Sequence, residues 1–226
     1  MNAIARAFPQ PAAPVSAQLA DMRFRNLIGR AEWDALPARV RARFAKRFYP
    51  GTAVCYRGTV LACRMNAAGR ILTQLARLIG APLPLDEGGG AAAVVTVTED
   101  GASGGQVWTR LYARPRGFPQ AIHSAKRFAG PTGLEEYLGR GCGIALVVRA
   151  VPGGIRFTSD HYFLHLGNLR IRLPHWLAPG RLTIDHGDLG AGRFAFDLAL
   201  AHPLLGLLIE QHSHFADDPA HHGDAQ

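Results

Sequence analysis

Two histidines and one aromatic–arginine set are the residues whose types and spacing best suit chemistry inside a pocket. His161 and His186 fall on the apolar faces of alternating segments, where an imidazole must find a hydrogen-bond partner or line a cavity. Trp108, Arg110 and Tyr112 share one face of a third alternating segment. An arginine flanked by aromatic rings is suited to recognise an anion. The plainer alternatives are hydrogen-bonded core histidines and an aromatic–arginine ladder on the protein surface.

These residues, with one phenylalanine and one glutamine from other apolar segments, form a candidate ligand-binding set. The set is Trp108, Arg110, Tyr112, Phe157, His161, His186 and Gln211. Its composition predicts a pocket with apolar walls and a few polar contacts, which suits a hydrophobic or amphipathic small molecule. The alternative is an enzyme that uses the same pocket, with His161 or His186 as the acid or base. A third alternative is a purely structural role in an interaction.

Signatures of cofactor and metal chemistry are missing from the sequence. It contains no phosphate-binding loop, no His-Glu-x-x-His and no Cys-x-x-Cys. Residues 139–143 hold three glycines, but the third comes one position early for a dinucleotide loop, and no βαβ unit follows. Cys142 in this stretch is expected to be a small buried thiol rather than a nucleophile. We therefore predict no cofactor and no metal, and we assign no catalytic residue.

One histidine pair has a spacing that a metal site would allow. His212 and His214 are two positions apart on the last alternating segment, about 7 Å along a strand. They fall on the face opposite Leu207 and Ile209. Exposure to solvent is therefore the expected outcome for both rings.

The elements that must position these residues are mostly strands. From Val94 to Phe215 the sequence alternates in short segments joined by glycine turns. In one of them, Ile155, Phe157 and His161 are predicted to share a face. The segments with strand character are residues 52–63, 92–99, 106–114, 118–128, 144–150, 155–165, 181–186, 193–201 and 205–215.

Two of these segments predict a hairpin with one apolar face. Leu182, Ile184 and His186 should lie on the same side as Phe194 and Phe196. We predict nine or ten strands in a large curved antiparallel β-sheet or a barrel-like meander. The physical reason is that a twisted sheet of this size rarely stays open with both faces bare.

The first 80 residues predict helices. One helix is expected over residues 32–48, where Trp33, Val40 and Phe44 recur at helical spacing. A second is expected from Asn66, as N-cap, to Ile79, with Gly80 as a stop signal. Its predicted buried stripe is Ile71, Leu72, Leu75, Leu78 and Ile79. Shorter helical segments are expected at residues 20–28 and 134–138. The predicted fold class is therefore α+β, with two or three helices from the N-terminal half packed on the sheet.

Length and composition predict a single domain in a reducing compartment. We expect a disordered leader at residues 1–18, one α+β domain at 19–215, and a disordered tail at 216–226. Cys55 and Cys63 lie too far apart on one predicted strand to pair, which favours the cytoplasm. No stretch approaches the roughly 20 apolar residues of a membrane span.

The net charge of +8 invites a nucleic-acid interpretation that the sequence does not otherwise support. Only Lys46 and Lys126 are lysines, so 25 basic residues minus 2 leaves 23 arginines, a bias typical of GC-rich bacterial genomes. The arginines are spread along the chain, and no nucleic-acid-binding motif accompanies them. We therefore expect no nucleic-acid partner.

A series of ordered landmarks resembles a known bacterial family. They are Cys55-Tyr56-Arg57-Gly58, Trp108-Thr109-Arg110, the segment from Gly130-Pro131-Thr132-Gly133 to Leu138-Gly139, the segment from Leu173-Pro174-His175-Trp176 to Pro179-Gly180, and His202-Pro203-Leu204-Leu205-Gly206. Together, over residues 24–215, they resemble the bacterial domain of unknown function 4166. The resemblance implies no assigned reaction. In some members this domain is similar to the C-terminal part of longer chains with a saccharopine-dehydrogenase-like reductase region, which implies a reductase as a partner.

Overall fold

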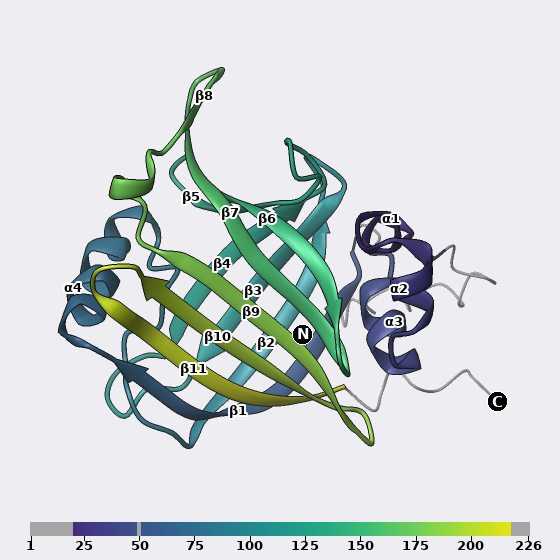
Figure 1. The fold of residues 1–226 in the computed structure, drawn as a ribbon. Coiled ribbons are helices and arrows are strands. Elements are labelled where there is room, and N and C mark those ends of the chain that lie inside the picture. Colours follow the sequence, from purple (N-terminus) through teal and green to yellow (C-terminus); the bar gives the residue numbers. More distant parts are fainter. Residues whose placement is uncertain (1–19, 49–50, 218–226) are drawn as a thin grey trace, which may run out of the picture.

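The computed structural model describes residues 20–48 and 51–217 and shows a closed antiparallel β-barrel with short helices at its two ends (Figure 1). The predicted α+β class and barrel-like meander are thus confirmed. The predicted leader at residues 1–18 lies outside the described residues, as does the predicted tail beyond Asp217.

The barrel is a meander of ten strands. Their order is β6-β5-β4-β3-β2-β1-β11-β10-β9-β7, and pairing of β6 with β7 closes the ring. An additional strand, β8, pairs with β7 alone. The strands are β1 (Ala53–Met65), β2 (Ala91–Asp100), β3 (Gly105–Tyr112), β4 (Gln120–Arg127), β5 (Glu135–Gly139), β6 (Cys142–Val151), β7 (Gly154–Leu166), β8 (Leu169–Arg172), β9 (Arg181–Gly190), β10 (Arg193–His202) and β11 (Gly206–Asp217).

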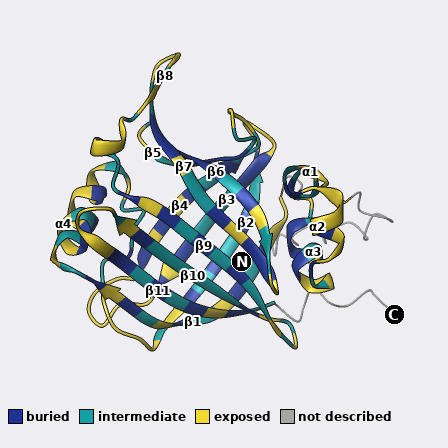
Figure 2. Cartoon of the chain, in the orientation of Figure 1, coloured by how far each residue is buried: buried dark blue, intermediate teal, exposed yellow. Residues whose placement is uncertain are grey.

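Alternation along the strands separates an inner from an outer face, as the buried and exposed positions in Figure 2 show. The predicted hairpin face is confirmed, because Ile184 pairs with Leu198 and His186 with Phe196 across β9 and β10. β3 likewise places Arg110 and Tyr112 inside the barrel.

Strand β5 replaces the helical turn predicted at residues 134–138. Glu135 and Glu136 are good helix formers in isolation, but here they pair with β4 on one side and β6 on the other. Without β5 the barrel would have an open edge between β4 and β6, so tertiary pairing overrides the local preference.

Helices α1 (Arg23–Ile28), α2 (Arg30–Asp34) and α3 (Ala38–Phe44) close one end of the barrel (Figure 1). The single helix predicted over 32–48 is wrong, because Pro37 lacks a backbone N–H and disfavours helical backbone before it. The predicted stripe is nevertheless buried. Phe24 and Phe44 pack edge-to-face at 5.1 Å and form a plug in this end of the barrel.

Helix α4 (Ala67–Ala76) and the 3₁₀ turn η1 (Arg77–Ile79) lie at the other end (Figure 1). The predicted N-cap is confirmed, because Gly69 donates its N–H to the Asn66 side chain at 2.8 Å. The predicted buried stripe is wrong in three members, since Ile71, Leu75 and Leu78 are 63%, 58% and 69% exposed. None of the described helices is long and apolar enough to cross a membrane.

A β-bulge in β7 overturns the face predicted for its second half. Ala145 pairs with His161, but the next residue, Leu146, pairs with Ser159, so Asp160 is an extra residue. One inserted residue exchanges inner and outer positions beyond it. Phe157 therefore stays on the inner face, whereas His161 falls on the face opposite Tyr162.

Candidate ligand-binding site

A cavity of about 330 Å³ lies inside the barrel at the α4 end. This volume falls within the range of small-molecule pockets, roughly 300–1,000 Å³. Strands β3 to β7 and β9 to β11 contribute to its wall, and most of the wall is apolar. The aliphatic residues that line it from the strands include Ile122, Ile144, Leu182, Ile184, Leu198 and Leu200.

The cavity opens between α4 and the 3₁₀ turn η2 (His175–Leu177). Leu72 and Ala76 line it from the inner side of α4. Leu75 and Leu177 also line it, and each is more than half exposed, so both lie where the cavity meets solvent. Of the exposed stripe of α4, Leu75 therefore lies at the rim of this opening, whereas Ile71 and Leu78 are not among the residues that line the cavity.

One polar cluster interrupts the apolar wall, formed by Arg110, Ser124, Lys126 and Glu136. All four residues are at least 93% buried. Ser124 donates to Glu136 Oε1 at 2.6 Å and accepts from Arg110 Nη1 at 3.1 Å. Lys126 Nζ lies 3.0 Å from Glu136 Oε2, whereas Arg110 Nη2 stays 3.6 Å from Glu136 Oε1. Arg110, Ser124 and Glu136 line the cavity, and Lys126 lies behind them.

The electrostatics of the polar cluster keep its carboxyl group ionised. Burial alone raises the pKa of Glu136, but the charges of Lys126 and Arg110 outweigh burial and lower it to about 2. Burial also lowers the pKa of Lys126. The charge of Glu136 opposes this decrease, and the charge of Arg110 reinforces it. The contact of 3.0 Å pairs Lys126 with Glu136. Arg110 is therefore the cation of the cluster that has no carboxylate of its own within the described residues.

Three of these four residues, Ser124, Lys126 and Glu136, are not among the predicted site residues. Alternation in β4 places Ser124 and Lys126 on the face of Ile122, a polar pattern on an apolar face that was visible in the sequence. Glu136 had been assigned to a helix. Only strand pairing brings the cluster together. Lys126 pairs with Glu136 across β4 and β5, and Trp108 pairs with Ser124 across β3 and β4.

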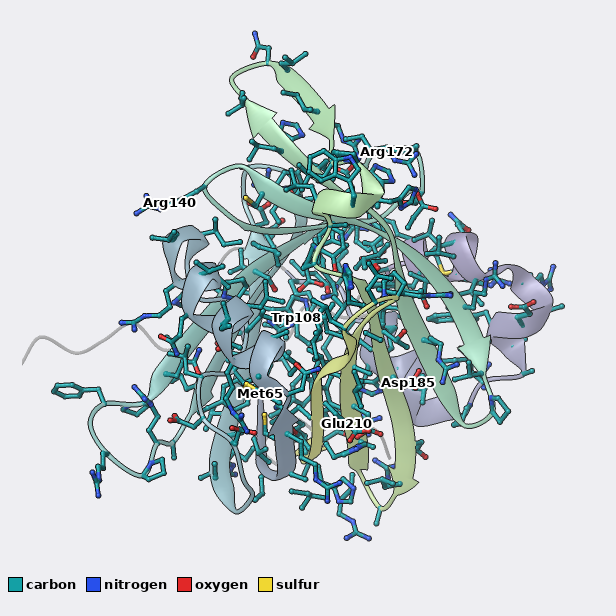
Figure 3. The ribbon with its side chains drawn as sticks, turned by 60° about the vertical axis from the view of Figure 1, so that its left-hand side comes forward. Met65, Trp108, Arg140, Arg172, Asp185 and Glu210 are labelled. Carbon is teal, nitrogen blue, oxygen red and sulfur yellow. The ribbon has the colours of Figure 1, made fainter. Side chains whose placement is uncertain are left out.

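The predicted aromatic–arginine set lies inside the barrel, which rules out the alternative of a surface ladder. Tyr112 lines the cavity beside Arg110. Trp108 lies deeper, within the barrel (Figure 3), and donates from Nε1 to Gln106 at 3.1 Å. Its ring is 5.0 Å from Lys126 Nζ, close enough for a cation–π contact. Gln211 lines the cavity from β11 and donates to Ser213 at 3.0 Å.

His186 lies inside the barrel but not at the cavity. Its ring stacks on Phe194 at 4.4 Å and meets Phe44 edge-on at 5.0 Å, in the aromatic plug under α3. Burial, with the charge of Arg43 second, lowers its pKa to about 3. His186 is thus a neutral core residue at physiological pH.

His161 is held on the outer face in a chain of hydrogen bonds. Arg170 Nη2 donates to His161 Nε2 at 2.9 Å and to Glu135 at 2.8 Å. Because a guanidinium can only donate, the imidazole proton lies on Nδ1, which is 2.6 Å from Asp160. Both ring nitrogens are therefore occupied, and His161 is not brought together with the cavity residues.

Phe157 is also separate from the cavity. Its ring lies 6.1 Å from Phe24 and 5.8 Å from Phe44, in the plug at the helical end. Of the seven predicted site residues, Arg110, Tyr112 and Gln211 line the cavity. Trp108, His186 and Phe157 lie deeper in the barrel interior, and His161 lies outside it.

Two other features with chemical potential have structural explanations. Gly101–Gly105 spells Gly-x-Ser-x-Gly, but it forms the turn between β2 and β3 rather than a strand-to-helix elbow, and Ser103 donates to Asp100 at 2.6 Å. His214 is exposed, as predicted, and the partly exposed His212 lies 2.9 Å from Asp197. Within residues 20–48 and 51–217, no three His, Cys, Asp or Glu side chains gather as metal ligands.

The comparisons agree with the resemblance noted in the sequence. No curated protein matches the chain. The family model described as domain of unknown function (DUF4166) matches residues 36–215, which reach from before β1 into β11 and include every residue that lines the cavity. The chain belongs to this DUF4166 family.

Proposed function

We propose that this protein is a binding module that holds a hydrophobic or amphipathic small molecule inside its barrel. The observation that carries the proposal is the cavity of about 330 Å³, which has an apolar wall and an opening between α4 and η2. Protein interiors are normally packed so closely that few voids exceed a water molecule. A space of this size inside the α4 end of the barrel therefore supports a role in binding.

The acid–base alternative has less support. His161 has both ring nitrogens occupied, and His186 lies in the aromatic plug. Cys142 lines the cavity, but burial raises the pKa of its thiol, which disfavours the reactive thiolate. Binding without a reaction is the simpler use of such a wall.

The test is a titration with Nile red, an uncharged apolar dye whose fluorescence rises in apolar surroundings. We expect saturable binding to the wild-type protein. Leu198→Trp places a larger ring in the cavity and should lower the affinity at least tenfold. Leu111→Trp is the matched control, because Leu111 is 40% exposed on the outer face of β3 and does not line the cavity.

Two results would contradict the proposal. One is the absence of saturable binding to the folded wild-type protein. The other is an equal affinity of the two tryptophan variants, which would place the dye on the surface. Circular dichroism of both variants checks that the barrel is intact.

A further inference from the structure

Arg110 differs from the other buried arginine of the described residues in how its charge is balanced. Arg43 donates to both oxygens of Asp217 at 2.9 Å each and has Asp188 within 3.6 Å. Arg110 has one hydrogen bond to a hydroxyl, that of Ser124, and a longer contact to Glu136. Within residues 20–48 and 51–217, the barrel therefore provides a bidentate carboxylate for Arg43 and none for Arg110.

The carboxylate nearest to Arg110 is already engaged. Glu136 accepts from Ser124 at 2.6 Å and faces Lys126 at 3.0 Å. Among the described residues that line the cavity, Glu136 is the only acidic one and Arg110 is the only basic one. A cation buried without its own counterion is unfavourable, so this site gains from the arrival of one negative charge.

We propose that the ligand is an amphiphile with a single carboxylate, which is bound by Arg110 at the inner end of the cavity while the apolar body lies toward the opening. This inference rests on the proposed binding function and names the chemical class of its ligand. Tyr112 and Gln211 line the same part of the barrel and offer further hydrogen-bonding groups.

A carboxylate fits better than a phosphate for two reasons. The guanidinium fork matches the two oxygens of a carboxylate, as the contact of Arg43 with Asp217 shows within this same barrel. A phosphate monoester carries about −1.5 to −2 charges at neutral pH, which exceeds the single positive charge of Arg110. The remaining charge would be buried among aliphatic side chains.

The experiment compares dodecanoate, dodecanol and dodecyl phosphate as competitors of Nile red at pH 7.5. The first two probes share one chain and differ in the head group. We expect dodecanoate to bind roughly tenfold more tightly than dodecanol, because a charge-assisted hydrogen bond is worth more than a neutral one. Dodecyl phosphate should bind more weakly than dodecanoate.

Arg110→Gln should abolish the preference for dodecanoate and leave the affinity for dodecanol unchanged. This variant leaves Lys126 and Glu136 as a balanced pair, so it is expected to fold. Arg149→Gln removes the same charge from an exposed position on β6 and should keep the preference. Thermal unfolding of both variants verifies that the barrel is intact.

The outcomes separate the two proposals. If none of the three probes competes with the dye, the binding function itself fails. If all three compete and dodecanol matches dodecanoate in the wild type, the binding function stands and the carboxylate inference is overturned. Tighter binding of dodecyl phosphate than of dodecanoate would also overturn it, as would a preference for dodecanoate that survives Arg110→Gln.

Discussion

Lys126 and Glu136 are direct partners across β4 and β5, and their charged groups lie 3.0 Å apart inside the barrel. Cross-strand partners on an inner face meet without further adjustment, so the pairing register itself creates this ion pair. Arg110 reaches the same carboxylate from β3 only through the longer contact of 3.6 Å. The pair is thus complete without Arg110, and this leaves the arginine facing the cavity.

The first prediction concerns the stability of this pair. Glu136→Gln leaves Lys126 and Arg110 buried without a counterion, and we expect the free energy of unfolding to fall by about 3 kcal/mol. Urea denaturation followed by tryptophan fluorescence measures the change. The double variant Lys126→Met with Glu136→Leu is the control, and it should lose less stability because it removes both charges. A single variant as stable as the wild type would show that Glu136 is not needed to balance the cluster.

The second prediction concerns pH. The pKa of His186 is about 3 in the folded protein and near 6.5 when unfolded, so the unfolded state takes up the proton first as pH falls. Stability is therefore complete above pH 6.5 and is lost as pH falls toward 3. Between pH 6.5 and 5 this amounts to about 2 kcal/mol.

His186→Phe should remove most of that loss, since a phenyl ring can stack on Phe194 and does not titrate. His175→Phe, at an exposed position on η2, is the control and should keep the wild-type pH dependence. Urea denaturation at several pH values gives the comparison. An identical slope for wild type and His186→Phe would mean that His186 is protonated as readily when folded as when unfolded.

The third prediction separates the aromatic plug from the cavity. Phe157→Ala removes a buried ring that packs on Phe24 and Phe44, and it should destabilise the protein by about 3–5 kcal/mol. Phe118→Ala removes a ring that is 92% exposed and should change stability by less than about 0.5 kcal/mol. If Phe157→Ala lowered the affinity for Nile red without a change in stability, Phe157 would be part of the ligand site.

The sequence was sufficient for the features that depend on local alternation. The inner positions of β3, β9 and β10 follow from a period of two, and that period is readable in one chain. The barrel-like meander follows from the number of such segments and the short turns between them. Arg110 and Tyr112 were found in this way.

The sequence was not sufficient for features that depend on the pairing of distant segments. The bulge at Asp160 adds one residue to β7 relative to β6, and no residue type marks that count. Glu136 enters the polar cluster only because β5 is needed to fill the sheet between β4 and β6. The stripe on α4 looks like a core stripe in sequence, yet Ile71 and Leu78 are exposed and Leu75 lies at the rim of the cavity.

The last prediction tests how α4 is seated over that cavity. An alanine inside a helix is normally about 1 kcal/mol more favourable than a glycine, so Gly69→Ala would be expected to stabilise α4. In this barrel, however, a Cβ at Gly69 would collide with the backbone carbonyl of Leu208 on β11, which is a rigid strand. We therefore expect the opposite sign, with a loss of about 1–3 kcal/mol as α4 is displaced from the barrel.

Gln74→Ala provides the control, because Gln74 is exposed on the same helix and an alanine there brings a small gain in helix propensity without a steric clash. Thermal unfolding gives the stabilities, and stopped-flow mixing with Nile red gives the rate at which the dye enters. Displacement of α4 should widen the opening, so Gly69→Ala should accelerate entry while Gln74→Ala leaves it unchanged. If Gly69→Ala were as stable as Gln74→Ala and took up dye at the wild-type rate, α4 would not be seated on β11 as described, and its part in covering the cavity would have to be abandoned.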